Sequence, residues 1–137
     1  MKKILAFLFI SLFLTNCSKL NIFGFGKEKN LFEKNNINEP LWRTTETILS
    51  NYPNVEKSIA DGFISTDWIR SKKNPNIRFR ITVYILGEDM LEENIEILSD
   101  KEKNINGQWI EMQTTNAFNQ NLKRIILRKA KDLDPET

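Results

Sequence analysis

The sequence predicts an α+β domain in which a helix, about four antiparallel strands and a second helix follow one another, with both helices packed on one face of the sheet in a helix-grip-like arrangement. Three observations carry this prediction. Apolar and polar residues alternate strictly over residues 78–86, which is typical of a strand with one buried face. Apolar residues recur at helical spacing in residues 40–52 and 116–133. Asn106-Gly107 stands between two short runs and is a strong hairpin signal.

The first helix is expected to begin near Pro40, because proline suits the first helical turn and Asn38 or Glu39 can cap it. Pro53 is expected to end it. The apolar face of this helix consists of Leu41, Trp42, Thr45, Ile48, Leu49 and Tyr52.

The first candidate strand runs from residue 59 or 62 to residue 69, and the polar residues 70–76, with Asn74-Pro75, are expected to form a turn. The clearest strand covers residues 78–86. One of its faces presents Phe79, Ile81, Val83 and Ile85, and the other presents Arg78, Arg80, Thr82 and Tyr84.

Residues 87–89 are expected to turn the chain into a third strand, which passes through Ile95 and Ile97 toward Lys101. After a turn at residues 104–107, a short fourth strand at residues 108–112 carries Trp109. The last helix is expected to begin near Thr115 or Asn116, both good caps, and to end before Pro135. Its apolar stripe consists of Phe118, Leu122, Ile125, Ile126, Ala130 and Leu133.

Residues 1–16 are expected to be a signal peptide, because Lys2-Lys3 precedes an apolar run at residues 4–14 that is too short to span a bilayer. The alternative for this run is a buried N-terminal helix. Leu14-Thr15-Asn16-Cys17 resembles a bacterial lipobox, although Asn16 departs from the usual small residue. The resemblance implies cleavage before Cys17 and acylation of its thiol. Ser18 then favours the outer membrane over the inner one, with the domain in the periplasm.

Residues 17–39 are expected to be a lipid-anchored, mostly disordered tether, and residues 40–134 a single domain. Apolar residues within this tether leave two other placements open, at the membrane interface or docked on the domain. These residues are Leu20, Ile22, Phe23 and Phe25.

Charge and composition argue against several classes of function. Removing Lys2 and Lys3 from the 20 Lys and Arg residues leaves 18, which equals the 18 Asp and Glu residues and argues against nucleic-acid binding. With no histidine and one cysteine, the chain cannot use Ser-His-Asp or Cys-His catalysis. There is no phosphate-binding Gly-rich loop and no metal-ligand spacing. We therefore expect neither an enzyme nor a cofactor.

Two groups of residues are candidates for binding. Asp67-Trp68 suits an interaction hot spot, but the favoured interpretation is that Trp68 packs in or beside the core while Asp67 faces water or caps a turn. Arg78, Arg80 and Tyr84 share one face of a strand and suit an anion or peptide site. The favoured alternative there is a solvated face with cross-strand pairs to Asp or Glu.

Several segments resemble the family known as domain of unknown function 3576, short proteobacterial lipoproteins. They are residues 41–43, 62–68, 76–86, 107–109 and 125–131. The resemblance spans roughly residues 40–133 and implies no activity or catalytic residue. The order of elements is also similar to the domains of the component C lipoprotein of the outer-membrane β-barrel assembly machinery. That likeness implies at most a role in envelope assembly.

Together these observations predict a non-enzymatic outer-membrane lipoprotein that binds an envelope protein, with the membrane held through acyl chains on Cys17. The alternative is a carrier of a small ligand or lipid that uses a cleft between sheet and helices. A closed apolar core would favour the first prediction, and an open cavity of several hundred cubic ångströms would favour the second.

Overall fold

The computed structural model describes residues 29–134, and residues 31–134 lie within one compact unit. The expected signal peptide, Cys17 and the expected tether up to residue 28 lie outside the described residues. Residues 31–39, assigned to the tether from the sequence, belong instead to the folded unit. Phe32 and Ile37 are buried in its core, and the Phe32 ring lies 6.0 Å from the Trp42 ring. The domain therefore begins before residue 40, because these two side chains complete its apolar interior.

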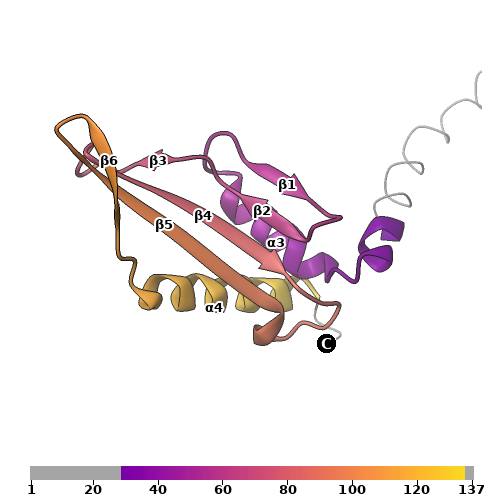
Figure 1. Cartoon of the computed structure of the whole chain (residues 1–137). Coiled ribbons are helices and arrows are strands. Elements are labelled where there is room, and N and C mark those ends of the chain that lie inside the picture. The colour runs from indigo at the N-terminus through magenta and orange to yellow at the C-terminus, as the bar shows by residue number, and fades with distance from the viewer. Residues whose placement is uncertain (1–28, 135–137) are drawn as a thin grey trace, which may run out of the picture. The chain divides into compact units, whose positions relative to one another are not determined.

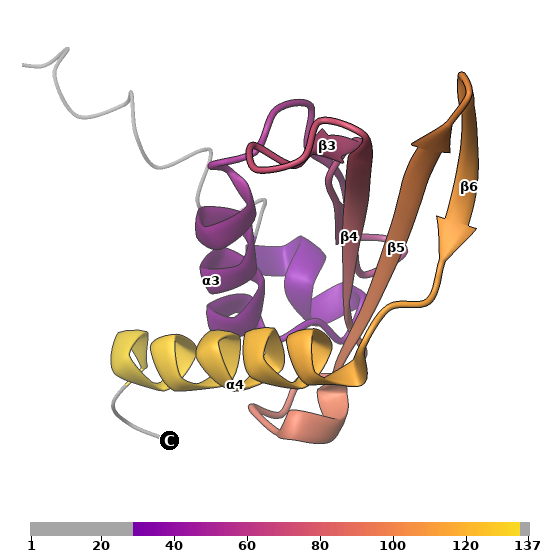
Figure 2. The ribbon, with the colours of Figure 1, turned by 90° about the vertical axis from the view of Figure 1, so that its left-hand side faces the viewer.

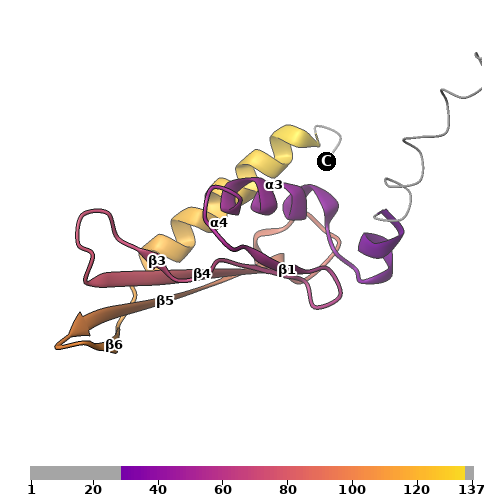
Figure 3. The same ribbon diagram turned by 90° about the horizontal axis from the view of Figure 1, so that it is seen from above.

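The fold is α+β, with helices α3 and α4 on one face of a six-stranded antiparallel sheet (Figures 1 and 3). The strands are β1 (Glu56–Ser58), β2 (Phe63–Ser65), β3 (Ile69–Arg70), β4 (Ile77–Ile85), β5 (Ile95–Ile105) and β6 (Gln108–Met112). They pair in the order β1-β2-β4-β5-β6. Strand β3 pairs with the first part of β4, at residues 78–79, on the same edge where β2 pairs with residues 82–84. The expected fold class is confirmed, with six strands in place of about four.

Helix α3 (Glu39–Leu49) begins where the sequence indicates, because the Asn38 side-chain oxygen accepts a hydrogen bond of 2.8 Å from the Leu41 backbone N–H. It ends at Leu49, one turn earlier than expected. Pro53 disfavours helical backbone at the residue before it, and Tyr52 lies in a turn. Helix α4 (Asn116–Leu133) packs on α3 and β5, with Ile126 and Ala130 buried. A short 3-10 turn, η1 (Glu92–Asn94), precedes β5.

The expected strand at residues 62–69 is split into β2 and β3 by a bulge. Ser65 pairs with Thr82 and Ile69 pairs with Phe79, so three residues (66–68) stand opposite two (80 and 81). At the bulge, the Thr66 hydroxyl accepts the Ile81 N–H at 3.1 Å, and the Thr66 N–H donates to the Ile81 carbonyl at 2.9 Å. One additional residue reverses the alternation of side chains along the strand. The bulge therefore turns Ile69 toward the helices.

Strand β1 was not predicted, because Glu56-Lys57-Ser58 lacks apolar alternation. It is a short edge strand made only of polar residues. It is defined by its pairing with β2, which the local sequence does not encode. Strand β5 runs to Ile105, four residues past the expected limit. Its second half pairs with both β4 and β6.

The core lies between the helices and one part of the sheet, formed by β2, the second half of β4 and the first half of β5. Ile81, Val83 and Ile85 of β4 are buried, as the alternation predicts. The other buried apolar residues are Phe32, Ile37, Leu41, Trp42, Leu49, Ile64, Met90, Ile95, Ile97, Ile126 and Ala130. Two expected members of the α4 stripe are exposed instead, Phe118 in the first turn and Leu133 at the last residue. The core therefore covers only part of the sheet, and the β5–β6 hairpin extends beyond the helices (Figure 2).

Candidate functional site

The sheet has one face that no described element covers, which we call the open face. It carries the side chains of β4 and β5 that alternate with the core residues, and Figure 2 shows it on the side away from α3 and α4. The pairing of β4 with β5 places Arg78 opposite Glu102 and Arg80 opposite Asp100. Leu98 lies on the same face, opposite Thr82, and is largely exposed. The open face is thus a surface of charges with a few apolar side chains.

Arg78 occupies the centre of a group of aromatic side chains. Its guanidinium carbon lies 4.5 Å from the ring centroid of Trp68 and 4.2 Å from that of Trp109. The same guanidinium donates from Nε and Nη2 to Glu102 Oε2, both at 2.6 Å. The two side chains of this ion pair are only 24% and 21% exposed. Arg78 is therefore fixed by two rings and one carboxylate.

Two further arginines extend this arrangement outward. The Arg80 guanidinium lies 5.1 Å from the Trp68 ring and donates to Asp100 Oδ2 at 2.7 Å. The Arg70 guanidinium lies 5.8 Å from the Trp109 ring. We call Trp68, Arg70, Arg78, Arg80 and Trp109 the Trp–Arg cluster. Each stacked pair contributes roughly 0.5–2 kcal/mol, depending on how far water is excluded.

The bulge after Ser65 explains how Trp68 reaches this cluster. The Asp67 carboxylate accepts the Trp68 N–H at 2.7 Å, and its other oxygen accepts from Asn54 Nδ2 at 3.4 Å. Asp67 thus holds the turn that presents the indole to Arg78. It faces water and is itself no member of the cluster.

Tyr84 lies on the open face but away from the cluster. It is four residues along β4 from Arg80, which corresponds to ~13 Å. Its ring contacts the Phe63 ring of β2 at 6.1 Å, and Glu96 is its partner on β5. The structure therefore brings together three of the five sequence-predicted binding residues, Trp68, Arg78 and Arg80.

Two members of the cluster were not expected from the sequence, Trp109 and Arg70. A signal for Trp109 was present. Asn106 and Gly107 both have positive φ, as a two-residue hairpin loop requires, and this loop sets Trp109 opposite Asn104 on the face of Glu102. Arg70 was assigned to a turn, because the bulge that creates β3 has no signal in the apolar pattern.

The opposite face of the sheet has a pocket of about 320 Å³ beside the first turn of α4. Phe79 of β4, Ser99 and Lys101 of β5, and Phe118 of α4 are among its lining residues. Asp100 and the connecting residues Gln113, Thr114 and Thr115 complete the lining. This pocket is separate from the Trp–Arg cluster, because inward and outward side chains of β5 lie on opposite faces.

Within residues 29–134, no group of His, Cys, Asp and Glu side chains is placed to hold a metal ion. The helices of this same part of the chain include none with the length and apolar character needed to cross a bilayer. No solved structure matches the chain.

The family described as "Domain of unknown function (DUF3576)" matches residues 35–135. A protein of Rickettsia prowazekii (strain Madrid E), "Uncharacterized protein RP420", is 31% identical over 115 residues, which cover 82% of this chain and 69% of that protein. The family match, at residues 35–135, includes the whole of the sheet and both helices described above. The chain therefore belongs to the DUF3576 family.

Proposed function

We propose that this protein is a non-enzymatic binding module of the bacterial cell envelope, anchored through acyl chains on Cys17 and binding a protein partner through the open face of its sheet. The observation that carries the proposal is the placement of Arg78 between Trp68 and Trp109 on an uncovered surface. Trp and Arg are the residue types most enriched among energetically dominant interface residues.

The order already present in the cluster supports this role. Side chains that are immobilised only on binding each cost about 0.5–1.5 kcal/mol of affinity. Glu102 and Asp100 hold Arg78 and Arg80 in place before any partner arrives. Because Arg78 and Arg80 already have acidic partners, a strongly acidic surface is not required of the protein that binds. A partner that presents an apolar or aromatic segment to the indoles fits this surface best.

The lipoprotein part of the proposal rests on the sequence of residues 1–18 alone. Leu14-Thr15-Asn16-Cys17 and the following Ser18 favour the outer membrane, with the domain in the periplasm. The likeness in element order to the component C lipoprotein of the β-barrel assembly machinery suggests, in general terms, a role in envelope assembly.

The anchor is tested by Cys17→Ala in the native cell. We expect loss of acyl labelling with a radioactive or alkyne fatty acid, and release of the protein from the membrane fraction. Cys17 supplies the only thiol of the chain, so no other cysteine can replace it. Unchanged labelling would rule out acylation at this residue.

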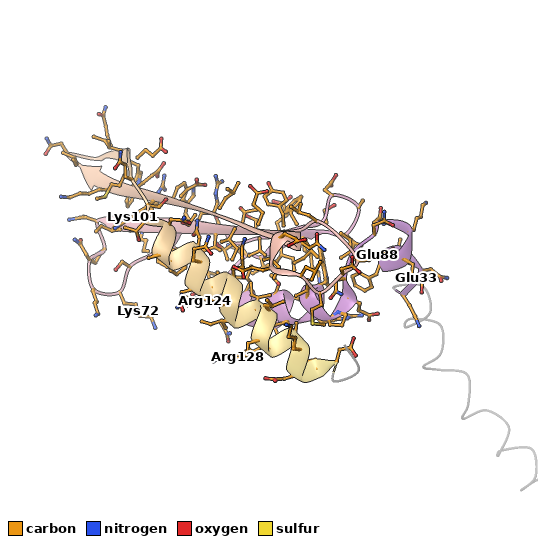
Figure 4. All side chains as sticks on the ribbon, turned by 90° about the horizontal axis from the view of Figure 1, so that it is seen from below. Glu33, Lys72, Glu88, Lys101, Arg124 and Arg128 are labelled. Atoms are coloured by element: carbon orange, nitrogen blue, oxygen red, sulfur yellow. The ribbon has the colours of Figure 1, made fainter. Side chains whose placement is uncertain are left out.

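The partner surface is tested by photocrosslinking in the same cells, with p-benzoylphenylalanine at position 98. Leu98 lies on the open face and is exposed, so the probe samples a bound partner without disturbing the core. The matched control carries the probe at Arg128, on the outer side of α4 (Figure 4). We expect one envelope protein to be captured from position 98 and not from position 128. Recovery of lipid alone from position 98 would end the proposal.

A second candidate function, a carrier of a small ligand or lipid, is favoured by a different observation. The pocket of about 320 Å³ between the sheet and the start of α4 lies in the size range of small-molecule sites. The core residues beside it are buried, and a pocket of this volume holds only a small ligand.

A further inference from the structure

The walls of the pocket are apolar and aromatic. Phe79 projects from the β4 side and Phe118 from the first turn of α4, and both rings line the same space. Phe118 is 45% exposed, although the helical pattern predicts it in the core. Covering such an exposed aromatic ring with an apolar ligand removes apolar surface from water, which favours binding.

Polar side chains without partners stand at the connection between β6 and α4. The side chains of Gln113, Thr114 and Thr115 make no hydrogen bond to any described residue. Thr115 is the N-cap of α4, yet its hydroxyl does not cap the helix. By contrast, Ser99 within the pocket donates to Asn119 Oδ1 at 2.8 Å and needs no further partner. The pocket thus combines apolar walls with one polar margin.

The charge of the pocket comes from Lys101. This lysine lies inward on β5, opposite Phe79 and Met112, and Figure 4 shows it beside the start of α4. It forms no ion pair with any residue of the described range. Asp100 also borders the pocket, but its carboxylate lies on the open face, bound to Arg80 at 2.7 Å. A ligand in the pocket therefore meets a lysine that forms no ion pair within the described residues.

The volume limits the length of the ligand. If each methylene-sized group takes roughly the 30 Å³ of a water molecule, the pocket holds about ten such groups. From the walls, the polar margin, the cation and this volume, we infer that the pocket binds a single-chain aliphatic carboxylate of about ten carbons. Its alkyl chain packs between Phe79 and Phe118, and its carboxylate pairs with the Lys101 ammonium. The inference rests on the second candidate function and is independent of the Trp–Arg cluster.

The test is photoaffinity labelling of the full chain held in nanodiscs, with decanoic acid that carries a terminal diazirine as the probe. Labelled residues are mapped by mass spectrometry, and unlabelled decanoate is added as competitor. We expect saturable labelling at Phe79 and within residues 99–101 and 113–118. Labelling that does not saturate, or that falls on the open face, would overturn the inference.

Two further competitors, decanol and acetate, distinguish the contribution of the carboxylate from that of the alkyl chain. We expect decanol to compete at a concentration about tenfold higher than decanoate, because the alcohol cannot form a charge pair with Lys101. Acetate is expected not to compete at all. If decanol competes as well as decanoate, the pocket does not recognise an anion, and the inference is wrong.

Lys101→Gln is expected to raise the half-saturating probe concentration about tenfold, to the level of the alcohol. The matched control is Lys103→Gln, on the same strand and face but outside the pocket lining, which we expect to change nothing. Trp68→Ala is expected to leave labelling unchanged while reducing partner capture, so failure of one proposal is distinguishable from failure of the other. Equal effects of the two lysine variants would contradict a role for Lys101.

Discussion

Alternate residues of β4 point to two different faces of the sheet, one covered by the helices and one exposed. Ile81, Val83 and Ile85 are buried beneath the helices, whereas Arg78 and Arg80 stand on a face that no described element covers. The covered face derives its stability from apolar area, and the open face from stacked rings and ion pairs that contribute much less. Fold and candidate interface can therefore be changed separately within nine consecutive residues.

The largest expected effect compares adjacent positions on these two faces. Ile81→Ala should lower the free energy of unfolding by about 3 kcal/mol, because it removes buried methyl groups and leaves a cavity. Arg80→Ala, next along the strand, should cost less than about 1 kcal/mol, since the Arg80–Asp100 pair is exposed. Urea denaturation of both variants measures the difference. Equal losses would mean that the open face is part of the stable core.

A second comparison concerns two glycines with positive φ, one buried against the backbone of β4 and one in the exposed β5–β6 turn. Gly62 has φ +68° and an added Cβ would meet the Ile85 carbonyl oxygen at 2.8 Å, whereas Gly107 has φ +89° with nothing within 4 Å. Gly107→Ala should cost about 1 kcal/mol, the cost of the left-handed backbone. Gly62→Ala should cost about 3 kcal/mol, because the backbone of β4 must also shift. Thermal unfolding of the two variants tests the ranking, and a larger loss at Gly107 would refute it.

The smallest expected effect compares the two ion pairs of the open face. Glu102→Gln should lower the free energy of unfolding by about 1 kcal/mol, since Arg78 is half-buried between two indoles. Asp100→Asn should lower it by about 0.5 kcal/mol or less, because its pair with Arg80 is solvated. The difference is measured by urea denaturation at two salt concentrations. A greater salt dependence for the Glu102 pair would contradict its assigned burial.

The sequence was sufficient for the elements that have strong local patterns. Alternation located β4, the Asn106-Gly107 turn located the β5–β6 hairpin, and Asn38 with Pro40 located the start of α3. It was insufficient where long-range pairing decides the structure. The polar strand β1 and the bulge between β2 and β3 are specified by their neighbours in the sheet.

The same division holds for the candidate site. Arg78 and Arg80 could be chosen from residue type and strand face, and Trp68 from residue type alone. Their assembly with Trp109 depends on the hairpin register, and the positions of Trp68 and Arg70 both depend on the bulge. A ligand cleft between sheet and helices was only the alternative prediction from the sequence. The helical pattern of α4 places Phe118 in the core, whereas in the structure this side chain is exposed and lines the pocket.

The central claim is that the open face binds the partner, and neighbouring residues of β6 test it most directly. Trp109 belongs to the Trp–Arg cluster, and Ile110 is an exposed residue of the same strand that points to the other face. Partner capture from the probe at position 98 is measured in Trp109→Ala and in Ile110→Ala, with both proteins checked for native circular dichroism. We predict that capture falls at least about tenfold in Trp109→Ala, as for a residue that dominates an interface, and is retained in Ile110→Ala. Retained capture in Trp109→Ala, or equal loss in both variants, would contradict the claim.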